Sequence, residues 1–191
     1  MPAASDSTQQ PIPAEVDRRA DEIIARYPVS KQSASLPLLQ LVQEEFGHIS
    51  DDHATWVADK LELKPINILE ILTFYPMLRR EPTGRFHIRV CRTLPCAMAG
   101  SYRLLENFAR QVGIDLDQAH QGDGHTHFLR SPCGTFSIEF AECLASCGTA
   151  PVCMVNDDFH EAVDPENPKP ILDQYRGQPE SAPPAATASD S

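Results

Sequence analysis

The sequence predicts an α+β fold in which a small helical bundle precedes a small α/β sandwich. Three observations support this prediction: apolar residues recur at helical spacing up to about residue 81, a strand-like alternation follows at once, and short hairpin patterns come later. We therefore expect a disordered amino terminus (1–13), a helical bundle (14–81), an α/β domain (82–176) and a disordered tail rich in Pro, Ala and Ser (177–191).

Four short helices are expected in the bundle. They cover residues 14–27, 36–46, a segment that begins after Ser50, and 65–76. Gly47 provides a stop for the second helix and Ser50 an N-cap for the third. Pro65 fits the first turn of the fourth helix, because an N–H there has no helical partner. Each helix has an apolar stripe, so the four can share one core.

The second domain should contain a strand, a helix and two hairpins. Residues 85–90 alternate polar and apolar side chains and predict a strand. Leucine and phenylalanine at helical spacing predict a helix over 97–112, which Gly113 ends. The hairpins are expected to pair 126–130 with 136–140, and 152–155 with 159–163.

Composition excludes several functional classes. Sixteen Lys and Arg against 27 Asp and Glu give a net charge of −11, which argues against binding to nucleic acid or to an anionic membrane surface. No run approaches the roughly 20 apolar residues of a membrane helix, and the first residues do not form a secretory signal. We therefore expect a cytoplasmic protein without direct membrane insertion.

Six cysteines carry the chemistry, and four of them form two close pairs. Cys91 and Cys96 have Cys-x4-Cys spacing, whereas Cys143 and Cys147 have Cys-x3-Cys spacing. Disulfides are disfavoured, because the expected compartment is reducing and a chain of this length needs no crosslinks. Four thiolates can bind one zinc ion or a [2Fe–2S] cluster with two thiolates per iron. The spacing favours iron–sulfur and leaves zinc and inert thiols open.

Two cysteines remain outside these pairs. Cys133 lies in a Pro-Cys-Gly turn, and Cys153 lies in an apolar strand where a free cysteine commonly serves as a small buried hydrophobe. Neither is expected to bind metal.

The cysteine motifs resemble those of a known family. The sequences CRTLPCAMAGS at 91–101, ECLASCGTAPVCMVNDD at 142–158 and LTFYPM at 72–77 are similar to the thioredoxin-like [2Fe–2S] subunit (the E-type or 24 kDa-type subunit) of NADH:quinone oxidoreductase, respiratory complex I. The resemblance covers residues 14–165. It implies a helical bundle followed by a thioredoxin-like domain, with Cys91, Cys96, Cys143 and Cys147 as the ligands of one [2Fe–2S] cluster.

The resemblance also implies a function in electron transport. The chain would be an oxidoreductase subunit of the respiratory chain whose low-potential cluster exchanges electrons with the FMN of a neighbouring subunit. That flavoprotein would bind FMN and NADH and form a heterodimer with this chain, within the peripheral arm at the cytoplasmic face of the inner membrane. This chain would have no catalytic residue of its own, which agrees with the absence of the common glycine-rich nucleotide-binding motifs from its sequence.

Three alternative functions are retained. The chain could be the equivalent diaphorase subunit of an NAD-linked formate dehydrogenase or hydrogenase. It could be a structural zinc module for assembly. It could also be a thiol–disulfide oxidoreductase, although that activity favours Cys-x-x-Cys at the start of a helix.

Other polar groups are expected to be structural. The segment around 118–133 is longer than is usual in the family, and its His120, Asp123, His125 and His127 could bind a transition metal, although polar loops commonly collect histidines. The four remaining histidines, His48, His53, His87 and His160, are expected at the surface or in turns. The pairs Glu44–Glu45 and Asp157–Asp158 are expected to be solvated carboxylates. Phe74 and Tyr75 could belong to the core or to a partner contact.

Overall fold

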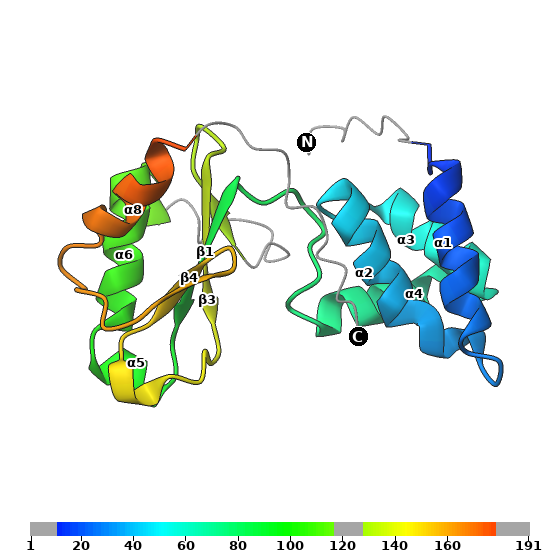
Figure 1. Ribbon diagram of the computed structural model, residues 1–191, viewed down its shortest axis with the longest axis horizontal. Helices are drawn as coiled ribbons and strands as arrows, with labels where there is room; N and C mark the ends of the chain where they lie inside the picture. Colours follow the sequence, from blue (N-terminus) through cyan, green and yellow to red (C-terminus); the bar gives the residue numbers. More distant parts are fainter. Residues whose placement is uncertain (1–10, 117–127, 179–191) are drawn as a thin grey trace. The chain divides into compact units, whose positions relative to one another are not determined.

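The computed structural model describes residues 11–116 and 128–178 of the chain (Figure 1). The chain divides between Pro82 and Thr83 into a helical unit and a unit built on a sheet. Both predicted disordered ends lie mostly outside the described residues, as do the cluster of His120, Asp123, His125 and His127 and most of the long segment 118–133.

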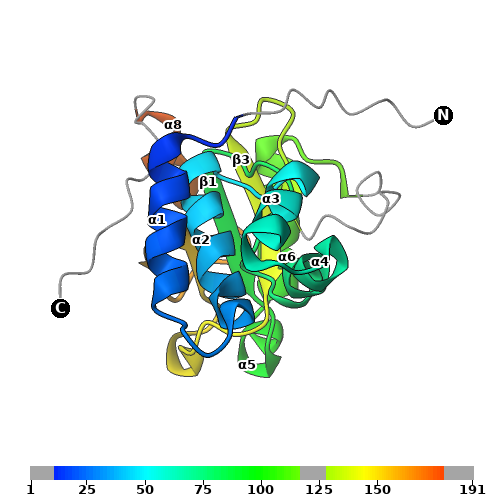
Figure 2. The same cartoon turned by 90° about the vertical axis from the view of Figure 1, so that its right-hand side faces the viewer.

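The helical unit contains the four predicted α-helices. They are α1 (Ala14–Ala25), α2 (Ser35–Phe46), α3 (Asp51–Leu61) and α4 (Pro65–Phe74), with a short 3-10 turn η1 (Lys31–Ala34) before α2. Figure 2 shows α1 and α2 side by side, in agreement with their contacts. The local signals are those expected from the sequence, because Gly47 is left-handed at the end of α2 and Ser50 caps α3. The fully buried side chains of the shared core include Leu38, Val57 and Ile68.

The second unit is built on a mixed five-stranded sheet with the order β2-β3-β1-β4-β5. Its strands are β1 (Phe86–Cys91), β2 (Leu129–Arg130), β3 (Phe136–Ala141), β4 (Cys153–Val155) and β5 (Asp158–His160). The central strands β1 and β3 are parallel, whereas the other neighbours are antiparallel. Both predicted hairpins are therefore present among the described residues.

Helices α6 (Ser101–Val112) and α8 (Lys169–Arg176) lie on the same face of this sheet (Figure 1). Strand alternation directs Ile88 and Ile138 into the core that these helices cover, where they meet Phe108 and Leu172. Each of these four side chains is at most 1% exposed. This packing fixes the ends of the central strands, where the cysteine motifs begin.

The structure corrects the predicted helix over 97–112. Two helices replace it, α5 (Leu94–Met98) and α6, and the chain turns between them at Gly100 with φ = 97°. A Cβ at Gly100 would lie 3.0 Å from Cγ of Pro165, so both the backbone conformation and the space favour glycine. Helix α8 was not predicted, although Ile171, Leu172 and Tyr175 form its buried stripe.

Two histidines expected at the surface are buried. His53 forms a reciprocal cap with Ser50: the Ser50 N–H donates to Nδ1 of His53 at 3.3 Å, and the His53 N–H donates to Oγ of Ser50 at 3.2 Å. Burial lowers the pKa of His53, and the neighbouring His48 adds to this effect. His87 lies 2.7 Å from Oγ of Ser137 through Nδ1 and 2.9 Å from Oε1 of Glu139 through Nε2. Both rings therefore have structural partners.

The two acidic pairs are exposed to solvent, and the two aromatic residues at the end of α4 differ in their burial. Glu44, Glu45, Asp157 and Asp158 are all exposed. Phe74 is 77% exposed, whereas Tyr75 packs partly buried against the helical core. None of the described helices is long and apolar enough to cross a membrane.

Candidate metal centre

The first cysteine pair lies at the carboxyl end of β1. Cys91 is the last residue of this strand and Cys96 lies in the first turn of α5. Both are buried, with 3% and 2% of their surface exposed, and they pack against Val152. The first pair is thus held by regular secondary structure inside an apolar surrounding.

The parallel arrangement of β1 and β3 brings the second pair to the same edge. Parallel strands end at one side of a sheet, and Cys91 lies opposite Ala141, the last residue of β3. The following loop carries Cys143 and then Cys147, which opens the 3-10 turn η2 (Cys147–Thr149). Both of these cysteines are exposed. Two sequence segments about fifty residues apart therefore meet at this edge, as a site with four thiolates requires.

Direct contacts join the two segments. The Arg92 N–H donates to the Ala141 carbonyl at 3.0 Å, and the Arg92 guanidinium forms an ion pair with the Glu142 carboxylate. The Thr93 hydroxyl donates to the Glu142 carbonyl and lies 3.5 Å from Sγ of Cys91. The start of the second loop is thereby fixed beside the first cysteine pair.

The surroundings of the buried sulfurs affect their charge. Burial alone would raise the pKa of Cys91, but hydrogen bonds from Thr93 and from the Leu144 N–H lower it below the usual value of a thiol. Burial raises the pKa of Cys96 despite a hydrogen bond from the Val152 N–H, and the nearby Cys91 and Cys147 raise it further. The pKa values of Cys91 and Cys96 are therefore shifted in opposite directions, and Cys91 loses its proton at the lower pH of the two.

These donors fit a [2Fe–2S] cluster. Such a cluster takes two thiolates on each iron, and backbone N–H groups directed at its sulfur atoms tune its potential. The site offers two thiol pairs, and the Leu144 and Val152 amides donate to Cys91 and Cys96 while the Ala145 amide donates to Sγ of Cys143 at 3.3 Å. In the described part of the chain, no three His, Cys, Asp or Glu side chains converge around a single ion position.

The two spare cysteines occupy contrasting environments. Cys133 is exposed in the turn between β2 and β3, with Sγ 3.5 Å from Oγ of Ser131 and 3.3 Å from Oγ1 of Thr135. These hydroxyls lower the pKa of Cys133 to about 7. Cys153 is fully buried in β4, and burial raises its pKa to about 12. The prediction that Cys153 is a buried hydrophobe is confirmed.

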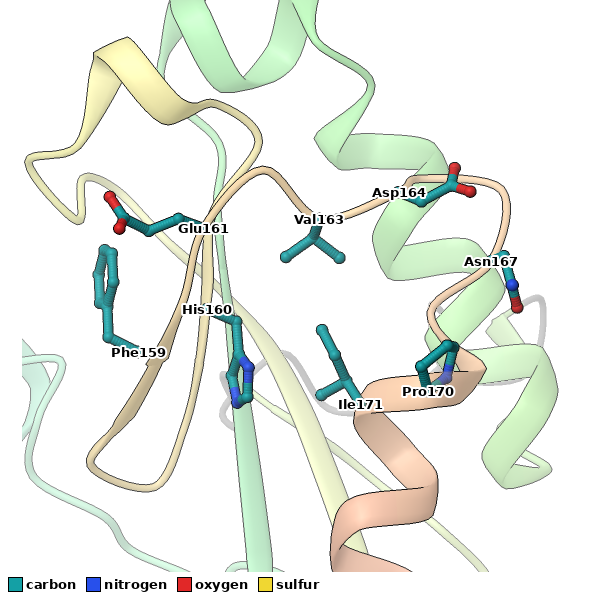
Figure 3. A pocket seen from close by; sticks show the side chains of 8 residues that line it. All are labelled: Phe159, His160, Glu161, Val163, Asp164, Asn167, Pro170 and Ile171. Atoms are coloured by element: carbon teal, nitrogen blue, oxygen red, sulfur yellow. The ribbon is translucent and has the colours of Figure 1, made fainter.

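One residue at this edge, Glu161, could not be expected from any pattern in the sequence. Its carboxylate accepts hydrogen bonds from Ser146 and Thr149, which lie on either side of Cys147. Glu161 lies outside every cysteine motif, and only the hairpin of β4 and β5 brings it near the loop. A hollow of about 350 Å³ lies beside β5 and α8, and its wall includes Glu161 together with His160, Val163 and Ile171 (Figure 3). Among the described residues, no cysteine lines this hollow.

Comparisons with known proteins agree with this geometry. The family model of the thioredoxin-like [2Fe-2S] ferredoxin matches residues 20–176. The E-type NADH-quinone oxidoreductase subunit of Rickettsia bellii (strain RML369-C) is 35% identical over 159 residues, which cover 82% of this chain and 89% of that protein. One of the E-type NADH-quinone oxidoreductase subunits of Rhizobium meliloti (strain 1021) is 34% identical over 152 residues, or 80% of this chain and 83% of that protein.

A solved structure shares the fold. The NAD+-reducing [NiFe]-hydrogenase in its H2-reduced state matches with a TM-score of 0.59 and 14% sequence identity, over 76% of this chain. This chain spans 22% of the length of that hydrogenase chain. At this identity the likeness concerns the arrangement of the elements alone.

Proposed function

The chain belongs to the thioredoxin-like [2Fe–2S] ferredoxin family, and from this membership we propose that it is the electron-transfer subunit of the NADH-oxidising module of an NADH:quinone oxidoreductase. The observation that carries the proposal is the meeting of two cysteine pairs at one edge of the sheet. We propose that Cys91, Cys96, Cys143 and Cys147 are the cluster ligands.

The residues of the chain would hold the cluster asymmetrically. A [2Fe–2S] cluster supplies one-electron chemistry and, with four thiolates, has a formal charge of −2 that becomes −3 on reduction. The buried pair excludes water from one side, while the exposed pair leaves the other side open to a partner. The net charge of −11 disfavours an added electron, so a low reduction potential is expected.

The partner would be a flavoprotein subunit that binds FMN and NADH. A cluster that carries single electrons needs an electron donor, and the exposed Cys143 and Cys147 offer the accessible side for its approach. We propose that this heterodimer lies in a peripheral arm at the cytoplasmic face of the inner membrane. As a second candidate, we propose the equivalent diaphorase subunit of an NAD-linked formate dehydrogenase or hydrogenase, because the family that the cysteine motifs resemble includes such subunits.

Co-expression of the full chain with the flavoprotein subunit of an NADH:quinone oxidoreductase tests the proposal. We expect a brown heterodimer with about two irons and two sulfides on this chain, a [2Fe–2S]⁺ paramagnetic signal on strong reduction, and an interface of more than about 2,000 Å² of buried area. Elution as two separate monomers at micromolar concentration would contradict the partnership. A colourless chain with one zinc ion would contradict the cluster.

Neighbouring genes separate the two candidates for the parent complex. A set of quinone-reductase subunits beside this gene supports the first candidate, and formate dehydrogenase or hydrogenase subunits support the second. In either complex, NADH should reduce the cluster only when the flavoprotein is present.

A further inference from the structure

One carboxylate outside the cysteine motifs holds the loop of the second cysteine pair. Oε1 of Glu161 accepts hydrogen bonds from Oγ of Ser146 at 2.7 Å and from Oγ1 of Thr149 at 2.6 Å. The two hydroxyl oxygens lie 2.8 Å from each other. Because Ser146 directly precedes Cys147 and Thr149 follows it by two residues, one oxygen atom fixes the chain on both sides of this cysteine.

Backbone hydrogen bonds fix Glu161 relative to the same loop. The Ala162 N–H donates to the Thr149 carbonyl at 2.7 Å, and the Val163 N–H donates to the Pro151 carbonyl at 3.0 Å. Glu161 also belongs to the wall of the hollow that His160 and Ile171 line (Figure 3). The hydrogen bonds from Thr149 and Ser146 lower the pKa of Glu161, so the group is charged at neutral pH.

The loop depends on such contacts because it is little buried and contains little regular structure. Cys143 and Cys147 are exposed, and the only regular structure described between β3 and β4 is the three-residue turn η2. Ala145 has φ = 58°, a left-handed conformation that favours glycine. A loop with an unfavourable backbone conformation and little burial keeps its shape only if its side chains are anchored.

We propose that Glu161 is a positioning residue for the cluster, which holds the Cys143–Cys147 loop in place and lowers the reduction potential through its negative charge. This inference rests on the proposed function. Glu161 does not contact the cysteines themselves through any of the described hydrogen bonds and acts through Ser146 and Thr149.

Two effects are expected and can be separated. The positioning effect depends on the hydrogen bonds and should govern how fast a chelator removes the iron. The charge effect depends on the carboxylate and should govern the potential, because a nearby negative charge opposes the added electron. For charges on the order of 8 to 10 Å apart, in a medium with a dielectric constant of about 40 to 80, Coulomb's law gives about a two- to sixfold change in the ratio of reduced to oxidised cluster.

The experiment uses the full chain with its cluster and follows bleaching by a chelator together with a potentiometric titration of the paramagnetic signal. Glu161→Gln keeps an oxygen acceptor and loses the charge. The rate at which the chelator bleaches this variant should lie within about twofold of the wild-type rate. At the midpoint potential of the wild-type chain, its ratio of reduced to oxidised cluster should be about two- to sixfold higher, where a tenfold change corresponds to a shift of about 59 mV in reduction potential. Glu161→Ala should show the same rise and should bleach at least about fivefold faster, because both hydrogen bonds are lost.

Two further variants complete the design. The double variant Ser146→Ala and Thr149→Val removes the hydroxyls, including their contact with each other, and keeps the carboxylate. It should therefore bleach at least as fast as Glu161→Ala, and adding Glu161→Ala to the double variant should cause no further acceleration. Asp157→Asn removes an exposed charge in the turn before β5 and should leave the bleaching rate unchanged.

The outcomes distinguish this inference from the proposed function. If Glu161→Ala loses its iron at the wild-type rate, the positioning role is overturned. It is also overturned if the effects of the carboxylate and hydroxyl variants on this rate are additive. A wild-type potential in Glu161→Gln overturns the charge effect. A wild-type chain that holds no cluster refutes the proposed function itself, before any variant is compared.

Discussion

Alkylation with iodoacetamide should separate the six cysteines by their environment. In the cluster-loaded chain we expect one fast reaction, at Cys133, because this thiol is exposed and its pKa is lowered to about 7 by Ser131 and Thr135. Cys153 should remain unmodified, because it is fully buried and burial raises its pKa to about 12. The proposed ligands should be protected by their iron.

The expected difference in alkylation rate follows from the fraction of each thiol that is ionised. At pH 7 about half of a thiol with a pKa of about 7 is ionised, against about 1% for a pKa of about 9 and about one part in 10⁵ for Cys153. A thiolate of lower pKa is also less nucleophilic, and two pKa units reduce its intrinsic rate by about six- to tenfold. Cys133 should therefore react about five- to eightfold faster than an ordinary exposed thiol.

Peptide mass spectrometry after timed labelling measures these rates across a pH series. Because the thiolate of Cys133 is lost as the pH falls through about 7, its rate should drop about tenfold for each unit below that value and level off above it. Cys133→Ser should abolish the fast phase. If the labelling rate of Cys133 instead had its midpoint near pH 9, or if Cys153 were labelled as fast as Cys133, the two environments would not control the reactivity of these thiols. Fast labelling of Cys143 or Cys147 would contradict the ligand assignment.

Three further outcomes are expected. Replacing any one of the four proposed ligands by Ala should abolish or severely destabilise the cluster, whereas Cys133→Ser should leave its absorption spectrum unchanged; the reverse pattern would refute the assignment. In urea unfolding, Phe108→Ala should cost about 3–5 kcal/mol because the side chain is fully buried, and Cys153→Ala only about 1 kcal/mol; equal losses would contradict the packing account. Gly100→Ala should destabilise the second unit by about 1–2 kcal/mol. Its control is Gly177→Ala, because the added Cβ meets no atom of the described residues within 4 Å and φ is −92°; a neutral Gly100→Ala would contradict the left-handed turn.

Local chemistry explains what could be predicted from the sequence. The ends of the bundle helices follow from residues that act within one turn, such as Gly47 and Ser50, and the strand at 86–91 follows from uninterrupted alternation. The family resemblance rests on the same kind of short-range pattern, since Cys91 and Cys96 are close in sequence. Features encoded within about six residues were therefore accessible.

Features that depend on distant residues were not accessible. The break between α5 and α6 reflects contact of Gly100 with Pro165, and helix α8 depends on burial of Leu172 against the sheet. His87 was expected at the surface or in a turn, yet it is buried and lies within hydrogen-bond distance of Ser137 and Glu139 on β3. In each case the deciding partner lies far away in the sequence.

The same distinction explains why the proposed ligands could be expected from the sequence, whereas Glu161, the residue proposed to hold their loop, could not. Cys91 and Cys96 obtain rigidity from burial at the end of β1 and in α5, so the strand and helix that fix them are readable near the motif itself. The second pair lies on an exposed loop and must obtain its rigidity from hydrogen bonds to other segments. Glu142 supplies one such contact, to Arg92, and Glu161 accepts two more, from Ser146 and Thr149. No sequence pattern indicates which loop a given carboxylate will contact. The contact of Glu161 with the loop could therefore be identified only from the folded β4–β5 hairpin.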